Sequence, residues 1–70
     1  MPSKFKNGDF LYNKTTKEYC LVLYSEEIWY VLKYLNGEYK NHHLTKFAHY
    51  IEGKFNKIES NNITKTLYGV

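Results

Sequence analysis

The dipeptide Asn36-Gly37 directly follows a run of strand-forming residues, and this combination restricts the fold more than any other feature of the chain. Asn and Gly both tolerate positive φ, which the type I′ turn of a two-residue β-hairpin requires. We therefore predict a hairpin whose loop is closed by Leu35 and Glu38. The cross-strand pairs in that register are Tyr34 with Tyr39 and Lys33 with Lys40.

Two runs of strand-forming residues, Glu18–Ser25 and Ile28–Leu35, lie before this turn, with Glu26-Glu27 between them. A two-residue loop at Glu26-Glu27 puts Tyr30, Leu32 and Tyr34 on one face, which we expect to be the core. Their predicted partners are Leu23, Leu21 and Tyr19. The pairs on the opposite face are Tyr24 with Trp29, Val22 with Val31, and Cys20 with Lys33. A longer loop changes these pairs.

Turn residues and the spacing of apolar residues predict the remaining strands and a helix. A first strand is expected at 10–12, after the turn signal Gly8-Asp9, and a last strand within 54–59. Between them, Leu44, Phe47, Ala48 and Ile51 recur at helical spacing, which predicts a short helix or helical turn near 44–52 that ends at Gly53. We expect residues 1–59 to form one β domain and residues 60–70 a mobile tail.

The composition favours a sheet and limits how the fold is stabilised. Among 70 residues there are eight tyrosines, four phenylalanines and one tryptophan, which fit pleated surfaces. Cys20 is the only cysteine, so an internal disulfide and a multi-cysteine zinc site are excluded. No apolar run approaches the roughly 18 residues of a membrane span. We expect a soluble, cytoplasmic, mostly β protein.

The segment from Phe5 to Ile58 resembles the small SH3-like barrels of the Tudor and KOW kind. The resemblance is carried by Gly8-Asp9 before the first strand, by the run from Tyr30 to Gly37, and by a final short strand after a helical turn. It implies a five-stranded barrel or a strongly bent antiparallel sheet. Members of that group bind peptides, methylated lysine, RNA or DNA, so the resemblance does not choose the function.

Catalytic and metal-binding patterns are missing from the sequence. Cys20 lies in the middle of a predicted strand, where a small buried side chain is expected. His42 and His43 are neighbours, and neighbouring side chains of a strand point to opposite faces, which disfavours a shared metal ion. Glu26-Glu27 is expected in a solvated turn. We predict no enzyme activity, no metal and no cofactor.

The candidate binding surface is the face of the predicted sheet that lies away from the core. It combines aromatic and aliphatic side chains with two lysines, as interface hot spots do. The alternative is that a helix, the tail or a second sheet layer covers this face. The predicted binding residues are Tyr24, Trp29, Val31, Lys33, Leu35 and Lys40.

Two functions fit this surface. The first is a protein-binding module that inhibits or redirects a host protein, since the chain is rich in Lys, Asn, Tyr and Ile and lacks Arg and Gln. That bias is typical of AT-rich coding sequence, such as that of a low-GC bacterium or its phage or mobile elements. The alternative is a nucleic-acid-binding module, supported by a net charge of +3 and by lysines interleaved with aromatic residues. A homodimer through the same face or a strand edge is a related alternative.

Overall fold

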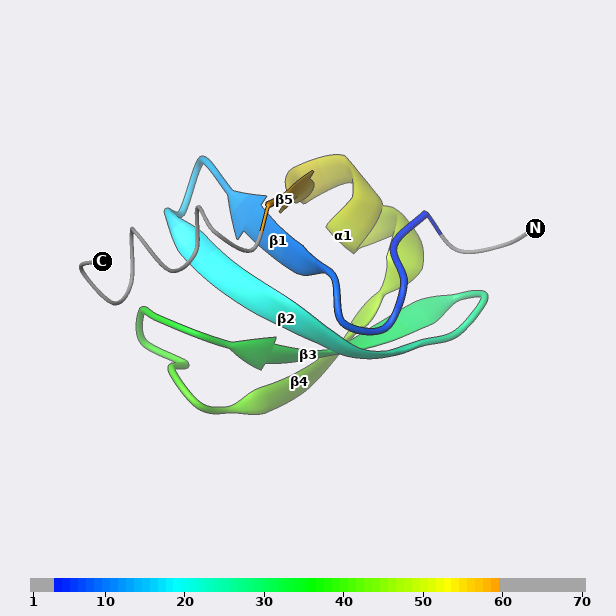
Figure 1. Ribbon diagram of the computed structural model, residues 1–70, viewed down its shortest axis with the longest axis horizontal. Coiled ribbons are helices and arrows are strands. Elements are labelled where there is room, and N and C mark those ends of the chain that lie inside the picture. The colour runs from blue at the N-terminus through cyan, green and yellow to red at the C-terminus, as the bar shows by residue number, and fades with distance from the viewer. Residues whose placement is uncertain (1–3, 60–70) are drawn as a thin grey trace.

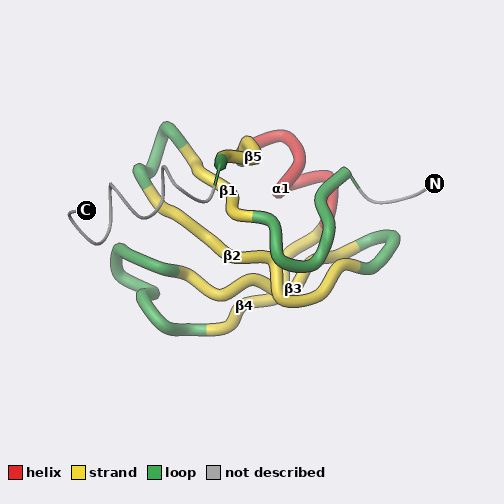
Figure 2. Tube along the Cα trace, in the orientation of Figure 1, coloured by secondary structure: helices red, strands yellow, loops and turns green. Residues whose placement is uncertain are grey.

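The computed structural model describes residues 4–59 as one antiparallel sheet of five strands with one helix (Figures 1 and 2). The elements are β1 (Phe10–Asn13), β2 (Glu18–Ser25), β3 (Trp29–Tyr34), β4 (His43–Phe47), α1 (Ala48–Lys54) and β5 (Asn56–Ile58). The order across the sheet is β4-β3-β2-β1-β5, so β4 and β5 form its two edges and the sheet is not closed. The predicted mostly β class is thus confirmed, as a bent open sheet with a short helix. The predicted tail, 60–70, lies outside the described residues.

The predicted faces of β2 are wrong for the residues before Leu23, because a β-bulge interrupts its pairing with β3, whereas Tyr24 lies on its predicted face. Val22 pairs with Leu32 while Tyr24 pairs with Val31, which leaves Leu23 as the extra residue. A bulge moves the residues beyond it to the opposite faces of the sheet. Cys20 and Val22 therefore enter the core, where Leu21 and Leu23 were expected. The turn itself is displaced by one residue, because the Glu26 N–H donates to the Trp29 carbonyl at 2.8 Å.

The two-residue hairpin predicted at Asn36-Gly37 is also wrong. β3 and β4 do pair antiparallel, but the connection between them covers residues 35–42. The chain stays beside β2 beyond the end of β3, since the Leu35 N–H donates to the Tyr19 carbonyl and the Tyr19 N–H donates to Asn36 Oδ1, both at 2.8 Å. These bonds hold Asn36 in place along β2 and prevent it from closing a tight hairpin.

The longer connection changes the cross-strand pairs that were expected around this turn. Gly37 does adopt a positive φ of 81°, but within a longer loop. Lys33 lies opposite His43 and not opposite Lys40. Tyr34 and Tyr39 are not strand partners, although their rings meet edge to face with centroids 6.0 Å apart.

The core lies between the concave side of the sheet and α1. β3 contributes Tyr30, Leu32 and Tyr34, as predicted. The other buried apolar side chains are Phe5, Leu11, Cys20, Val22, Ala48, Ile51 and Phe55. Burial of such side chains contributes about 1.5–3 kcal/mol for each large one, and this small cluster supplies most of the stability of a domain of this size.

The helix begins later than its sequence spacing predicts. Leu44 and Phe47 belong to β4, because Leu44 pairs with Leu32 and Phe47 with Trp29. The helix then starts at Ala48, whose N–H donates to the Ile28 carbonyl at 2.7 Å, and it continues to Lys54. Only Ala48 and Ile51 of the predicted apolar stripe are on the buried side of α1.

A short polar network joins the segment before β1 to the core and the helix. The Tyr30 hydroxyl donates to Glu52 Oε2 at 2.5 Å and accepts the Phe5 N–H at 3.1 Å. The Lys4 N–H donates to the same carboxylate oxygen at 3.2 Å. The buried hydroxyl is thereby satisfied, which removes the penalty of burying a tyrosine in an apolar core.

Candidate binding surface

The convex side of the sheet holds four of the six predicted binding residues together. Trp29, Val31 and Lys33 alternate with the buried side chains of β3, and Tyr24 lies opposite Val31. Trp29 is 42% exposed and Tyr24 51% exposed, while Val31 and Lys33 are half-buried. Within residues 4–59 neither the helix nor a second sheet layer covers Trp29 and Tyr24. The alternative of a covering tail falls on residues 60–70, outside the described residues.

Leu35 and Lys40 do not belong to this group. Both lie in the connection 35–42, at the opposite end of β3 from Trp29. Leu35 is half-buried and hydrogen-bonded to β2, and Lys40 is exposed in a turn. Their expected place beside Trp29 depended on the two-residue hairpin and is lost with it.

Residues that the sequence analysis did not select extend the surface around Trp29. Phe47 is its direct partner on β4 and is 61% exposed, which is the highest value among the large apolar side chains described. Ile28, before β3, and Tyr50, on α1, are exposed nearby. Phe47 was assigned to a helical face, and only its cross-strand pairing with Trp29 reveals its place. We call Ile28, Trp29, Phe47 and Tyr50 the Trp29–Phe47 patch.

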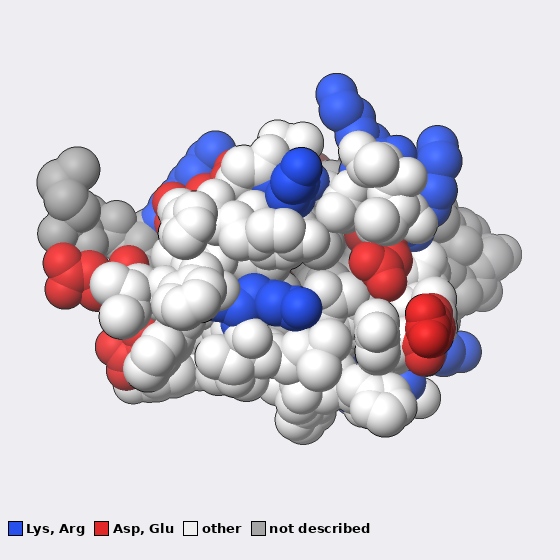
Figure 3. Space-filling view, turned by 180° about the vertical axis from the view of Figure 1, so that it is seen from behind, with Lys and Arg blue, Asp and Glu red and all other residues white. Residues whose placement is uncertain are grey.

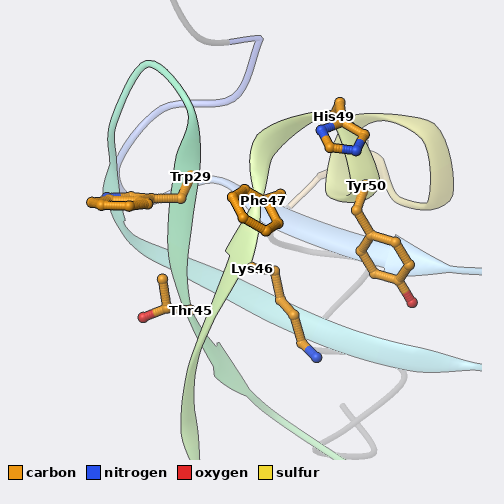
Figure 4. A pocket seen from close by; sticks show the side chains of 6 residues that line it. All are labelled: Trp29, Thr45, Lys46, Phe47, His49 and Tyr50. Atoms are coloured by element: carbon orange, nitrogen blue, oxygen red, sulfur yellow. The ribbon is translucent and has the colours of Figure 1, made fainter.

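Two open hollows meet at Phe47. The larger, about 480 Å³, is lined by Trp29, Thr45, Lys46, Phe47, His49 and Tyr50 (Figure 4). Figure 4 shows Trp29 and Thr45 on one side of β4 and Lys46 and Tyr50 on the other. The second, about 430 Å³, is lined by Glu27, Ile28, Phe47, Ala48, His49 and Glu52. The Phe47 and His49 rings stack between the two hollows, with centroids 6.0 Å apart.

The charges around the patch differ between its two sides. β3 and β4 carry Lys33, His43 and Lys46 and contain no carboxylate. Glu27 and Glu52 lie on the other side of Phe47, in the second hollow. On the face drawn in Figure 3, lysine and carboxylate side chains are scattered among uncharged residues and do not form one continuous patch of either sign. The surface is therefore apolar with a local positive charge along β4.

One edge of β4 is free in the described part of the chain. His42 and Ala48 direct backbone groups toward β3, since the His42 carbonyl accepts the Tyr34 N–H at 3.0 Å and the Ala48 N–H bonds to Ile28. Backbone groups alternate in an antiparallel ladder, so those of His43, Thr45 and Phe47 point away from β3. β4 is an end strand of the sheet within residues 4–59. His43 and Thr45 thus offer donors and acceptors beside the patch, and Phe47 offers its N–H, while its carbonyl is the N-cap acceptor of α1.

Cys20, which the sequence analysis considered for chemistry, is held in a state unsuited to nucleophilic attack. Cys20 is buried, and its burial, with a smaller effect of Glu18, raises the pKa of the thiol to about 12 against the opposing hydrogen bond with Tyr34. A protonated, inaccessible thiol is a poor nucleophile. Among residues 4–59 no three His, Cys, Asp or Glu side chains gather to hold a metal ion. His42 instead meets the Tyr39 ring, with centroids 6.4 Å apart.

Relationships to other proteins assign no roles to these residues. The one helix of the described segment is seven residues long, and no helix there is long and apolar enough to cross a membrane. Geometry, burial and charge are therefore what distinguish the Trp29–Phe47 patch from the rest of the surface. No protein-family model matches the chain, and no curated protein or solved structure matches it.

Proposed function

We propose that this chain is a non-enzymatic, SH3-like protein-binding module that captures its partner through the Trp29–Phe47 patch. The observation that carries the proposal is the exposure of Trp29 and Phe47, by 42% and 61%, although they face each other across two paired strands. Contiguous exposed aromatic side chains are uncommon on monomeric proteins and are typical of interface hot spots. Each large apolar side chain that a partner covers contributes about 1.5–3 kcal/mol.

The nature of the partner follows from the composition of the chain. A coding bias toward AT-rich codons supports an origin in a phage or mobile element of a low-GC bacterium. In that setting the partner is a host protein in the cytoplasm, and binding inhibits or redirects it. A small chain without catalytic groups acts on another protein by occupying its surface, for which a single hot-spot cluster is sufficient.

Nucleic acid is the alternative partner, and the charges near Phe47 weigh against it. Stacking of bases on Trp29 and Phe47 would bring phosphates close to Glu27 and Glu52 as well as to Lys46. Nucleic-acid affinity depends mainly on lysines and arginines that neutralise several phosphates together. On the face drawn in Figure 3 the lysines are scattered and form no continuous track for a phosphate backbone.

The proposal is tested by capture from a lysate of the source organism or its host, with and without nuclease. Trp29→Ala and Phe47→Ala are compared with Tyr39→Ala, which removes a 44%-exposed aromatic ring at the opposite end of β3. We expect one protein to be captured by the wild type and by Tyr39→Ala, to be lost with both patch variants, and to resist nuclease. Circular dichroism of each variant verifies the fold.

Two outcomes would contradict the proposal. Undiminished capture by folded Trp29→Ala and Phe47→Ala proteins would place the binding site elsewhere. Capture that disappears with nuclease and weakens steeply between about 50 and 200 mM salt would identify the chain as a nucleic-acid-binding module.

A further inference from the structure

We infer that the partner binds as an extended segment that adds a strand to the free edge of β4 and carries a carboxylate opposite Lys46. The inference rests on the proposed protein-binding function and specifies how the partner binds. It assigns the edge of β4 as a recognition site, with an acidic, β-forming peptide segment as its ligand. Strand addition obtains affinity from backbone hydrogen bonds and specificity from alternate side chains.

The first step concerns the backbone of β4. His43 and Thr45 direct their N–H and carbonyl groups away from β3, as the bonds at His42 and Ala48 establish. Phe47 adds its N–H only, because its carbonyl is the N-cap acceptor of α1. Five residues in a regular register with β3, without a bulge or a proline, provide a straight template for an added strand. The opposite edge differs, because β5 has three residues, and its Lys57 side chain lies 3.7 Å from the Asp9 carboxylate. Short, charged edges resist pairing with another strand.

The second step concerns the position of the larger hollow. Its lining includes Thr45 and Phe47 from the convex side of β4 and Lys46 from the concave side, so the hollow extends around the free edge (Figure 4). An added strand would lie in that hollow, with alternate side chains directed to the two faces. Those on the convex face would contact Phe47 and Trp29, and those on the concave face would contact Lys46 and Tyr50.

The third step concerns charge. Lys46 is half-buried on the concave side, opposite Tyr30, and no described carboxylate forms an ion pair with it. β3 and β4 contain no acidic residue. A carboxylate on the concave face of the added strand would lie beside the Lys46 ammonium, whereas a lysine there would be repelled. The expected ligand therefore alternates apolar side chains with Asp or Glu.

The same charge disfavours a second copy of this chain as the occupant. The symmetric antiparallel register centred on Thr45 is the one that pairs all five residues of β4. It puts Lys46 opposite Leu44 of the other copy, so the two Lys46 side chains become diagonal neighbours on one face, about 7–8 Å apart. An inward-directed lysine on an edge strand is a common device against self-association. An acidic segment relieves this repulsion and a second copy does not.

The test uses a library of random twelve-residue peptides displayed on phage and selected against the full-length protein. Thr45→Pro removes an N–H that faces away from β3, so it blocks the edge while leaving the β3–β4 ladder in place. Lys46→Glu reverses the charge, and Lys14→Glu is the matched control in the exposed turn between β1 and β2. The best peptide is synthesised with single N-methyl groups along its backbone.

We expect selected peptides without central proline that alternate apolar residues with Asp or Glu. Thr45→Pro should weaken binding about tenfold or more and Lys46→Glu about fivefold, with Lys14→Glu within about twofold. N-methylation should weaken binding at every second residue only, because alternate peptide amides face β4. The N-methylation pattern is measured on the wild-type protein. It therefore tests whether the peptide pairs as a strand even if the Thr45→Pro protein fails to fold.

Loss of binding by Trp29→Ala together with full binding by a folded Thr45→Pro protein would overturn the inference and leave the proposed function standing. N-methyl effects without a period of two, or a selection without acidic residues, would also overturn it. A dimer in sedimentation equilibrium that Thr45→Pro dissociates would assign the edge to a second copy instead. Peptides that bind equally to the Trp29→Ala, Phe47→Ala and wild-type proteins would contradict the proposed function itself.

Discussion

The two sides of β3 differ in what covers them, although their side chains alternate along one short strand. Tyr30, Leu32 and Tyr34 face α1 and are almost completely buried, whereas Trp29 faces outward and is exposed. Both sides carry aromatic side chains, Trp29 outward and Tyr30 and Tyr34 inward, so aromatic character alone does not distinguish them. The core therefore forms on the side of the sheet that the helix and the segment around Phe5 cover. The side they leave open is the one that we propose for binding.

The largest expected effect comes from removing a side chain on the covered side. Leu32→Ala should lower the free energy of unfolding by about 3 kcal/mol, because it leaves a cavity beneath α1. Val31→Ala, the adjacent residue on the other side, should cost less than about 1 kcal/mol. Urea unfolding followed by circular dichroism measures both values. Equal losses would mean that the two sides contribute similarly to the fold.

An intermediate effect is expected from alkaline pH, which acts through the covered side. Burial raises the pKa of the Cys20 thiol from 9.0 to about 12, and burial also raises that of the Tyr34 hydroxyl. The unfolded chain therefore loses these protons at a lower pH than the folded chain. The contribution of the two groups to the free energy of unfolding is fully present below about pH 9, and it is lost as the pH rises toward 12. At pH 10.5 the loss from Cys20 should be about 2 kcal/mol.

Urea unfolding at pH 8 and pH 10.5 measures this loss. In a Cys20→Ala protein the share of the pH dependence that belongs to Cys20 should disappear, leaving the weaker fall from Tyr34. A Cys20→Ala protein with the full wild-type pH dependence would show that the thiol is not held protonated by the core.

The smallest effect on stability is expected from the patch. Trp29→Ala should change the free energy of unfolding by no more than about 1 kcal/mol, since the ring is 42% exposed and the bond that closes the turn uses the Trp29 carbonyl, which the substitution leaves in place. The same substitution should abolish partner capture. A large loss of stability in this variant would show that Trp29 supports the fold, and the contrast between the two sides of β3 would then be weaker than we infer.

Much of the architecture follows from local sequence patterns. The strand at Glu18–Ser25 was predicted with its observed bounds, and the predictions near β3 and β5 overlap the observed strands. The alternation along β3 correctly separated Trp29 from Tyr30, because side chains of a strand alternate whatever its partners are. Leu44 and Phe47 were assigned to the wrong element, since the helical spacing that they share with Ile51 arises by chance across the end of β4.

The sequence alone predicted only part of the candidate surface. Tyr24, Trp29, Val31 and Lys33 lie on the predicted face, while Leu35 and Lys40 do not lie beside Trp29. Phe47 and Lys46 join the surface through pairing with β3, which depends on the length of the connection 35–42. An Asn-Gly pair indicates a local preference for positive φ. It does not predict that a distant strand will hydrogen-bond the asparagine side chain, as β2 does here.

The sequence by itself determined the strand-forming segments and the residues of β3 that share a face, because both depend on side chains a few positions apart. The tertiary structure decided the rest. The bulge at Leu23, the bond between Tyr19 and Asn36, and the docking of α1 on β3 all join groups that are distant along the chain or depend on the whole ladder. Their energies become available only when the core forms. For that reason the pair Trp29 and Phe47, on which the proposed function depends, appears in the fold and not in the sequence.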